Sequence, residues 1–209
     1  MSDQKIAIVT DSSAYIPDEL MRGLDIHVIP VWLIWDEVSY QDGVDIHPDE
    51  FYKRLKTSKT LPTTAQPTAN EFERIFRECG KMYDAVVAPL VSSKMSGTIA
   101  SAQAALNELS DMSIRIIDTL AGSMAHGLVV LAAARAAAAG SVIDDFVSAA
   151  RKVQEKVNLV FVVDTLEFLQ RSGRISGATR YMATALQFRP ILPFAEGRIA
   201  PLAQARTRK

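Results

Sequence analysis

Hydrophobic residues in the first three quarters of the chain form short runs that alternate with longer amphipathic segments. The runs are rich in β-branched residues and are closed by polar ones, which is typical of buried strands. They lie at 5–10, 25–35, 83–91, 113–118 and 158–164. Strands that alternate with helices indicate βαβ units, so the pattern predicts an α/β fold with a parallel sheet covered by helices.

Local signals mark the ends of several predicted helices. Pro48 suits the first turn of a helix, and Thr68 with Glu71 forms the capping-box pattern of the next one. The segment between these helices, 60–67, contains two prolines and predicts a loop. A long alanine-rich helix is expected to end at Gly140, because glycine is favoured just after a helix.

The rhythm changes after residue 157. The remaining chain predicts helices at 165–174 and 178–187, then a hairpin with its turn at Glu196-Gly197. We therefore expect an N-terminal α/β domain, 1–157, and a smaller C-terminal α/β domain, 158–209. A domain of that size is marginal alone, and the hairpin leaves an unpaired edge. We expect the second domain to be incomplete or to lean on another chain.

Composition narrows the functional classes. Of 209 residues, 48% are hydrophobic and 22% charged, and the net charge of -1 gives no electrostatic basis for nucleic-acid binding. The single Cys79 fits a reducing compartment, so a cytoplasmic location is expected. The N-terminus lacks the apolar region of a signal peptide. The longest apolar tract is interrupted by Arg135 and is too short to span a membrane.

Polar loops follow three of the predicted strands: "TDSS", "VSSKMSGT" and "DTLAGS". Ligands of open parallel sheets bind at the carboxyl ends of the strands, where such loops gather. The second loop also precedes a helix, so its backbone amides and helix dipole favour an anion, with hydroxyls as further donors. These hydroxyls belong to Ser92, Ser93, Ser96 and Thr98. The alternative is that Ser96 caps the helix and the other serines solvate the loop.

Two further segments carry candidate donors. Thr63, Thr64 and Gln66 lie in the proline-bracketed segment, which is either a donor loop or a rigid connector. Arg171 and Arg174 flank a glycine in "QRSGRISG". An arginine can donate two parallel hydrogen bonds to a carboxylate, although a solvated helix end explains the same pattern.

Several alternative chemistries lack their motifs. The chain contains neither GxGxxG nor GxxxxGK[ST], and "KMSGT" is not a serine-hydrolase elbow. His27, His47 and His126 fall in separate predicted elements, so we expect no metal site, no cofactor and no catalytic residues. His126 is expected to be a hydrogen-bonded core residue. The carboxylate-rich "QDGVDIHPDE" lacks the spacing of an EF-hand and predicts a solvated turn.

Nine blocks, in one order, give the chain a resemblance to the DegV family of bacterial fatty-acid-binding proteins. They are "IAIVTDSSAYIP", "VIPVWLIW" with "YQDGVDI", "EFYKRL", "PTTAQPTANEF", "VSSKMSGTIASA", "IRIIDTLAGSMAHG", "FVVDTLEFLQRSGRISGA", "FRPILPFAEGRI" and "ARTRK". The resemblance implies a two-domain α/β protein that holds one long-chain fatty acid, with the acyl tail in an apolar tunnel between the domains.

The resemblance also implies the residues of the site. The carboxylate would be held by loop hydroxyls and one arginine, above a floor shaped by the first strand's loop. The implied residues are Thr63, Thr64, Ser92, Ser93, Ser96 and Arg174 at the carboxylate, with Asp11 and Ser12 at the floor. Such a protein is a carrier rather than an enzyme. It would present the acid to a separate ATP-dependent fatty acid kinase, which makes an acyl phosphate.

Two features depart from the family pattern. Ala65 stands where the family has a hydroxyl residue, so a hydrogen bond worth about 0.5–1.5 kcal/mol is lost at or near the head group. The family chain also continues beyond "RTRK", with a part that completes the second domain's sheet and supplies a late histidine near the head group. Both departures are expected to weaken lipid binding.

Two other functions stay open on the sequence. One is an enzyme that acts on a phosphorylated small molecule at the Ser92–Thr98 loop, which the helix start favours and the absence of a general base in the motif disfavours. The other is a regulatory interaction protein whose pocket is vestigial. Whether lipid or phosphate copurifies with the protein would discriminate among the three.

Overall fold

The computed structural model describes residues 4–140, 143–175, 189–200 and 203–205. Its centre is a parallel sheet of four strands in the order β2-β1-β6-β7, which confirms the predicted α/β class. The strands are β1 (Ile6–Asp11), β2 (Ile26–Ile29), β6 (Ala85–Leu90) and β7 (Ile114–Asp118). Every residue of β1 and β6 is buried, as expected for central strands that are covered on both faces.

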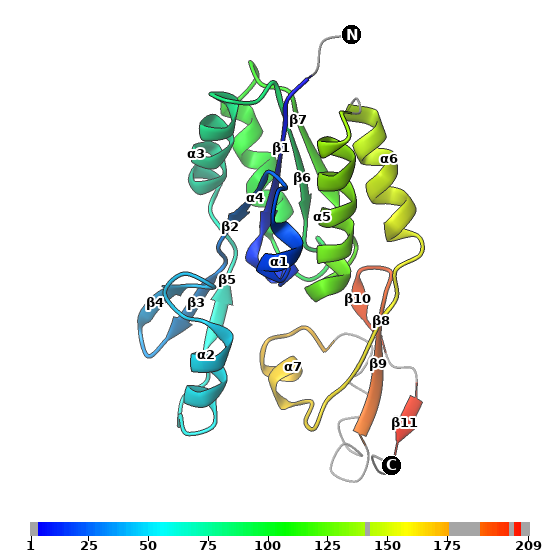
Figure 1. Ribbon diagram of the computed structural model, residues 1–209. Coiled ribbons are helices and arrows are strands. Elements are labelled where there is room, and N and C mark those ends of the chain that lie inside the picture. The colour runs from blue at the N-terminus through cyan, green and yellow to red at the C-terminus, as the bar shows by residue number, and fades with distance from the viewer. Residues whose placement is uncertain (1–3, 141–142, 176–188, 201–202, 206–209) are drawn as a thin grey trace.

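Helices cover both faces of this sheet (Figure 1). One face packs against α3 (Ala69–Gly80) and α4 (Thr98–Ala105), and its core contains Phe72, Phe76 and Ile114. The other face packs against α5 (Ser123–Ala138) and α6 (Ile143–Gln154), and its core contains Val129 and Phe146. Two short elements, η1 (Ser12–Ala14) and α1 (Asp18–Met21), follow β1, and η2 (Leu106–Glu108) follows α4.

The predicted helix ends are present. α2 (Pro48–Leu55) begins with proline in its first turn. Thr68 and Glu71 form the complete capping box of α3, with each side chain bonded to the other's backbone amide. Gly140 follows the end of α5 with a φ of 72°, a left-handed conformation that glycine adopts without a Cβ clash.

A second sheet lies beneath the parallel one in the view of Figure 1, and the sequence predicted only one of its strands, as part of the strand region 25–35. It is antiparallel, in the order β4-β3-β5, and packs its core of Leu33, Trp35 and Ile46 against α2. Its strands are β3 (Trp32–Trp35), β4 (Val38–Gln41) and β5 (Thr63–Ala65). The prediction of a loop over 60–67 is therefore wrong at its centre. β3 offers β5 a free edge, and the β-branched Thr63 and Thr64 are suited to a strand.

The third sheet contains the C-terminal strands. β8 (Leu159–Val162), β10 (Arg198–Ile199) and β11 (Ala203–Ala205) each pair antiparallel with β9 (Arg189–Ala195). The predicted hairpin turn is confirmed, with Glu196 and Gly197 at φ 50° and 79°. α7 (Glu167–Arg171) is the first predicted helix of this part, and the second, 178–187, lies outside the described residues. The domain boundary near residue 158 stays a prediction.

Hydrogen bonds join this third sheet to the loops of the parallel sheet. The backbone carbonyl of Gly197 accepts a hydrogen bond from Ser92 Oγ at 2.8 Å, and that of Glu196 accepts one from Lys94 Nζ at 2.9 Å. The β9–β10 turn therefore sits on the loop that follows β6. Among the described helices, none combines the length and the apolar character that a bilayer crossing requires.

Candidate functional site at the carboxyl edge of the parallel sheet

Asp11 ends β1 and connects it to the neighbouring strand β6. Its side chain is fully buried, and Oδ2 accepts a hydrogen bond from the Val91 backbone amide at 2.9 Å. Oδ1 accepts from the amide of Ser13 at 3.1 Å and from the Ser13 hydroxyl. Asp11 thus fixes the turn η1 and ties together the ends of two strands.

Ser12 is also held within the fold. Its Oγ donates to Asp42 Oδ2 at 2.7 Å and accepts from the Val31 amide at 3.1 Å. Asp42 follows β4 and belongs to the carboxylate-rich segment that was predicted to be a solvated turn. Its carboxylate accepts the Ser12 hydroxyl instead of being only solvated. Asp11, Ser12 and Asp42 line a cavity of about 530 Å³.

Ser92 and Ser93 follow β6 and have committed hydroxyls. Ser92 is fully buried and bonds the Gly197 carbonyl. Ser93 Oγ donates to Asp118 Oδ2 at 2.6 Å. Asp118 also accepts the backbone amides of Ser93 at 3.3 Å and Leu120 at 2.9 Å. Asp118 is a residue that sequence reasoning missed, although its place at the end of a strand was visible.

The Ser96 hydroxyl is the one in this loop whose hydrogen is available to a ligand. Its Oγ lies 2.8 Å from Thr98 Oγ1 and accepts the Thr98 amide at 3.3 Å. Two hydroxyl hydrogens share one bond, so one of them can point elsewhere. Since Thr98 is fully buried and Ser96 half-buried, the Ser96 hydrogen is the one that can reach a ligand. Gly97, not Ser96, is the N-cap residue of α4.

Arg174 reaches the same loop from the C-terminal part. Its Nε donates to the Met95 carbonyl at 3.2 Å and its Nη1 to the Ser172 carbonyl at 2.6 Å. Within the described part of the chain, its guanidinium has no carboxylate partner. A half-buried cation without a counter-ion favours an anionic ligand nearby.

Thr63 and Thr64 sit on β5 and point to opposite faces of its sheet. Thr64 pairs with Leu33 and lines a cavity of about 130 Å³ together with Tyr15 and Phe51. Thr63 pairs with Ile34 on the other face. Because side chains alternate along a strand, the two hydroxyls cannot serve one small head group from the same side.

The proline-bracketed segment, 60–67, contacts the Ser92–Thr98 loop through Gln66. A Cβ added at Gly97 would lie 2.9 Å from Gln66 Nε2, so the Gln66 amide rests directly on the glycine. The Ser92–Thr98 loop therefore receives Gln66 from one segment and Arg174 from another. Asp11, Ser12 and Thr64 surround the neighbouring cavities, joined to this loop through the Asp11–Val91 hydrogen bond.

His126 lies behind the site, within the core. It is fully buried, and its Nε2 is 3.1 Å from Thr10 Oγ1 and 3.2 Å from the Pro89 carbonyl. Burial lowers the pKa of His126, although the charge of Asp11 acts in the opposite direction. The prediction of a hydrogen-bonded core histidine is confirmed.

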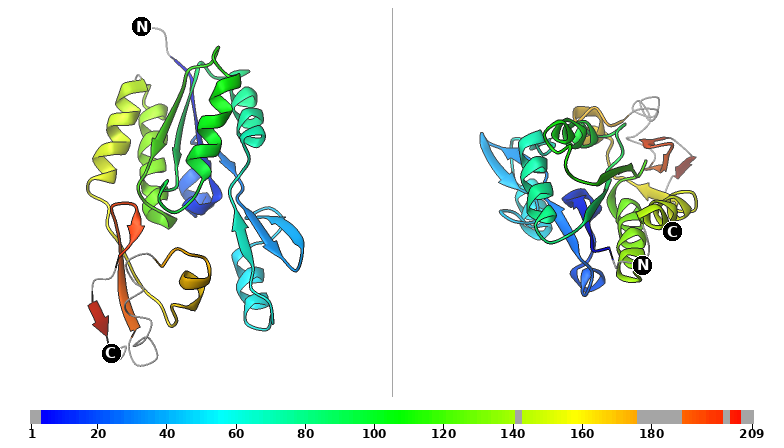
Figure 2. Two further views of the ribbon diagram at one scale, coloured as in Figure 1. Left: turned by 180° about the vertical axis from the view of Figure 1, so that it is seen from behind. Right: turned by 90° about the horizontal axis from the view of Figure 1, so that it is seen from above.

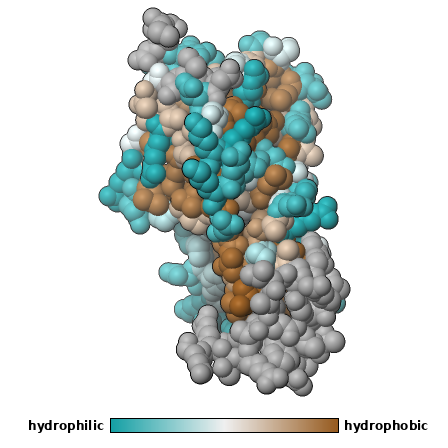
Figure 3. All heavy atoms as spheres, turned by 90° about the vertical axis from the view of Figure 1, so that its right-hand side faces the viewer, coloured by the Kyte–Doolittle hydropathy of each residue, from teal (hydrophilic) through white to brown (hydrophobic). Residues whose placement is uncertain are grey.

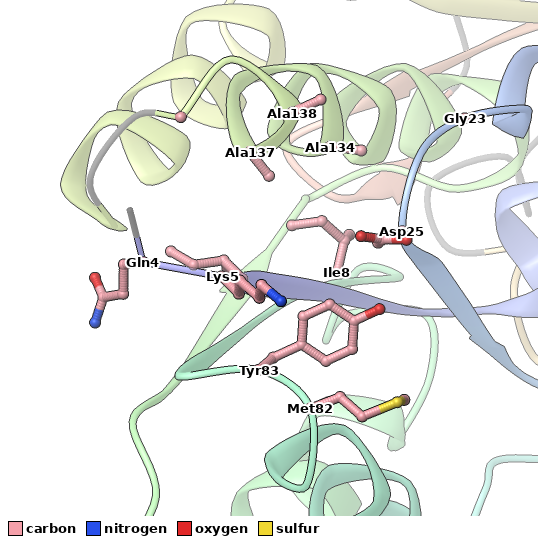
Figure 4. A pocket seen from close by; sticks show the side chains of 12 residues that line it. Gln4, Lys5, Ile8, Gly23, Asp25, Met82, Tyr83, Ala134, Ala137 and Ala138 are labelled. Carbon is pink, nitrogen blue, oxygen red and sulfur yellow. The ribbon is translucent and has the colours of Figure 1, made fainter. Parts of the chain in front are cut away.

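A cavity of about 650 Å³ at the opposite edge of the parallel sheet contains none of the predicted site residues. Figure 4 shows Lys5 and Tyr83 on one side and Ala134 and Ala137 of α5 on the other. It lies at the amino end of β1, whereas the hydroxyl loops follow the carboxyl end. Among the described residues, no cluster of three or more histidine, cysteine, aspartate or glutamate side chains could hold a metal ion.

The fold is that of an α/β protein with hydroxyl-rich loops at the carboxyl edge of its parallel sheet. The model of the DegV family of uncharacterised proteins matches residues 5–209. The Protein DegV of Bacillus subtilis is 37% identical over 205 residues, which cover 98% of this chain and 73% of that relative. The chain therefore belongs to the DegV family.

Solved structures agree with this assignment. A DegV family protein of Thermus thermophilus, described for its fatty acid binding, superposes with a TM-score of 0.89 at 33% identity, covering 97% of this chain and 72% of that one. DegV of Bacillus subtilis, described as a fatty acid binding protein, gives a TM-score of 0.89 at 36% identity, with 98% and 73% covered. A Thermotoga maritima protein with a reported fatty acid binding function gives 0.82 at 29% identity, with 97% and 72% covered.

Proposed function

We propose that this protein binds a long-chain fatty acid, with the carboxylate at the Ser92–Thr98 loop. The observation that carries the proposal is the meeting of Gln66 and Arg174 on this one loop. The available donors are the Ser96 hydroxyl and the Arg174 guanidinium, which has no carboxylate partner among the described residues. Relatives described as fatty acid binding proteins support the ligand class.

The remaining predicted residues take supporting places in this proposal. Ser92, Ser93 and Asp11 hold the loop and the strand ends in position through their own hydrogen bonds. Thr64, Thr63 and Ser12 shape the neighbouring walls. The acyl tail lies between the N-terminal and C-terminal parts. Partly buried apolar side chains of the C-terminal part, Phe161, Val163 and Phe194, cluster with Met95 of the loop and offer surface that a tail would cover.

The protein acts in this proposal as a cytoplasmic carrier and not as an enzyme. It presents the acid to a separate ATP-dependent fatty acid kinase. Support comes from the serines and the histidine: Ser92 and Ser93 are bonded to Gly197 and Asp118, and His126 is bonded to Thr10 and Pro89 rather than to a serine. A purified fatty acid kinase should release acyl phosphate from palmitate only when this protein is present, and equal release without it would contradict the carrier role.

The head-group assignment is tested by replacing Arg174 with alanine. Hydrogen bonds to charged groups contribute about 1.5–3 kcal/mol, so palmitate should bind about 10- to 150-fold more weakly. Methyl palmitate, which has no charge, should be affected little. Arg171→Ala is the matched control, because Arg171 is exposed and pairs with Glu167 at 2.8 Å. Equal losses for acid and ester would refute the role of Arg174.

An anionic phosphate is the second candidate for the same loop. α4 begins at Thr98 behind an N-cap glycine without a side chain, which leaves amides to an anion. Mass spectrometry of an organic extract of the purified protein, together with a phosphate assay, separates the two. Near-stoichiometric fatty acid supports the carrier, whereas phosphate without lipid supports the enzyme.

A further inference from the structure

The outer edge of the parallel sheet offers an interaction surface that is independent of the lipid site. β7 is the last strand of the order β2-β1-β6-β7. The strand lies between α4 on one face of the sheet and α6 on the other (Figure 2). Among the described residues, no strand pairs with its outer side.

The hydrogen-bond register shows which backbone groups face outward. The Val86 amide donates to the Ser113 carbonyl, and the Thr119 amide donates to the Leu90 carbonyl. In a parallel ladder, alternate residues direct both backbone groups to the same neighbour. Odd-numbered residues of β7 therefore bond β6, and Ile114, Ile116 and Asp118 direct their amides and carbonyls to the open edge.

A charged groove runs beside this edge. It has a volume of about 540 Å³ and is lined by Arg115 of β7 and by Val147, Arg151 and Gln154 of α6. Both arginines are exposed, and neither forms a salt bridge within the described part of the chain. The Asp118 carboxylate is turned toward Ser93 and the Leu120 amide. The groove therefore presents two arginines without a salt bridge among the described residues, and one carboxylate, Asp118, that is bonded to Ser93, beside backbone groups that no described strand pairs with.

A second groove continues from the first. Arg151 and Gln154 also line a cavity of about 540 Å³ that extends to Leu120 and the β9–β10 turn. Figure 3 views the α6 side of the molecule, where polar side chains cover part of an apolar surface. An extended segment that pairs with β7 would pass Arg151 and end beside the loop that carries Ser93.

We propose that the edge of β7 binds an extended acidic segment of a partner protein by adding it as a fifth strand. Free backbone groups supply main-chain hydrogen bonds, and Arg115 and Arg151 select for carboxylates. A second copy of this chain is a poorer occupant. Antiparallel pairing of β7 with itself would place four arginines, two from each copy, around one groove.

Amide hydrogen exchange on the full chain tests the strand addition. The probe is a capped heptapeptide that alternates glutamate and valine. Without it, the amides of Ile114 and Ile116 should exchange faster than those of Arg115 and Ile117. Saturating probe should slow exchange at Ile114 and Ile116 by about tenfold or more, with little change at Arg115. A heptapeptide that alternates lysine and valine should give no protection.

Charge reversal tests the role of the arginines. R151E should weaken binding of the acidic probe by about tenfold, the change expected for one lost charge-assisted contact. K152E is the matched control, because Lys152 is exposed on the same helix but does not line either groove. R115E should repeat the effect of R151E. Retained slow exchange at Ile117 shows that each variant is folded.

Four results would overturn the proposal. The first is absence of binding by the acidic probe at millimolar concentration. The second is equal binding of the lysine probe, and the third is equal effects of R151E and K152E. The fourth is concentration-dependent protection of Ile116 in the free protein, which would show that β7 pairs with a second copy.

Discussion

Asp11 gives the sharpest test of how the site is built, through the substitution Asp11→Asn. The new side chain has nearly the same shape, but one of the two oxygens becomes a donor. That donor must face either the Val91 amide or the pair of Ser13 donors. At least one hydrogen bond to a charged acceptor is therefore lost in a fully buried place. The magnitude follows from general values.

Such a bond contributes about 1.5–3 kcal/mol, and a buried amide left unsatisfied costs about 1–3 kcal/mol. Both values include part of the same desolvation cost, so they are not simply added. Asp11→Asn should therefore lower the free energy of unfolding by about 2–4 kcal/mol. Urea denaturation followed by circular dichroism measures this change, with the m-value expected to stay constant. Asp18→Asn, at an exposed helix start, should change stability by less than about 0.5 kcal/mol. A loss below about 1 kcal/mol for Asp11→Asn would refute the reasoning.

Three further outcomes are expected. An alanine Cβ at Gly197 would lie 2.6 Å from Ser92 Oγ, whereas a Cβ at Gly43, which has a similar φ of 78°, would meet nothing within 4 Å. Gly43→Ala should lower the free energy of unfolding by about 1–2 kcal/mol. Gly197→Ala should lower it clearly more in urea denaturation. Burial lowers the pKa of His126 below 6.5, so the unfolded chain binds more protons than the folded one, and stability should fall as the pH drops below about 6.5. Between pH 7 and pH 5, the free energy of unfolding should therefore decrease less for a His126→Gln variant than for the parent. Burial raises the pKa of the Cys79 thiol to about 11, so at pH 8 the native protein should react with a disulfide reagent at least about 100-fold more slowly than the unfolded chain.

The parallel sheet could be predicted because its signals are local. β1 and β6 are continuous apolar runs, β7 is interrupted only by Arg115, and polar residues end or follow all three; the capping box at Thr68 needs only four residues to be recognised. The antiparallel sheet could not be predicted in the same way. β5 has three residues, and its register with β3 depends on a partner about 30 positions away. Short strands are determined by pairing, which periodicity does not record.

The site shows the same division between local and distant information. The sequence placed the hydroxyls of the Ser92–Thr98 loop at the carboxyl end of a strand, and the structure has them there. It did not reveal that Asp118 accepts the Ser93 hydroxyl, nor that Gln66 rests on Gly97. Thr63 and Thr64 look equivalent in the sequence, and only their strand makes them face apart.

The many hydroxyls between β6 and α4 have a physical explanation in these contacts. A loop at the crowded edge of a parallel sheet contains backbone amides and carbonyls that must be satisfied away from bulk water. Ser92 satisfies the carbonyl of the β9–β10 turn, Ser93 satisfies Asp118, and Thr98 is buried against Ser96. Once these structural bonds are assigned, the donor left over is the Ser96 hydroxyl, on the loop that Arg174 also contacts. Most hydroxyls of this loop are therefore already used within the fold and are not free for a ligand. The proposed head-group contacts at this loop reduce to one serine, Ser96, and one arginine, Arg174.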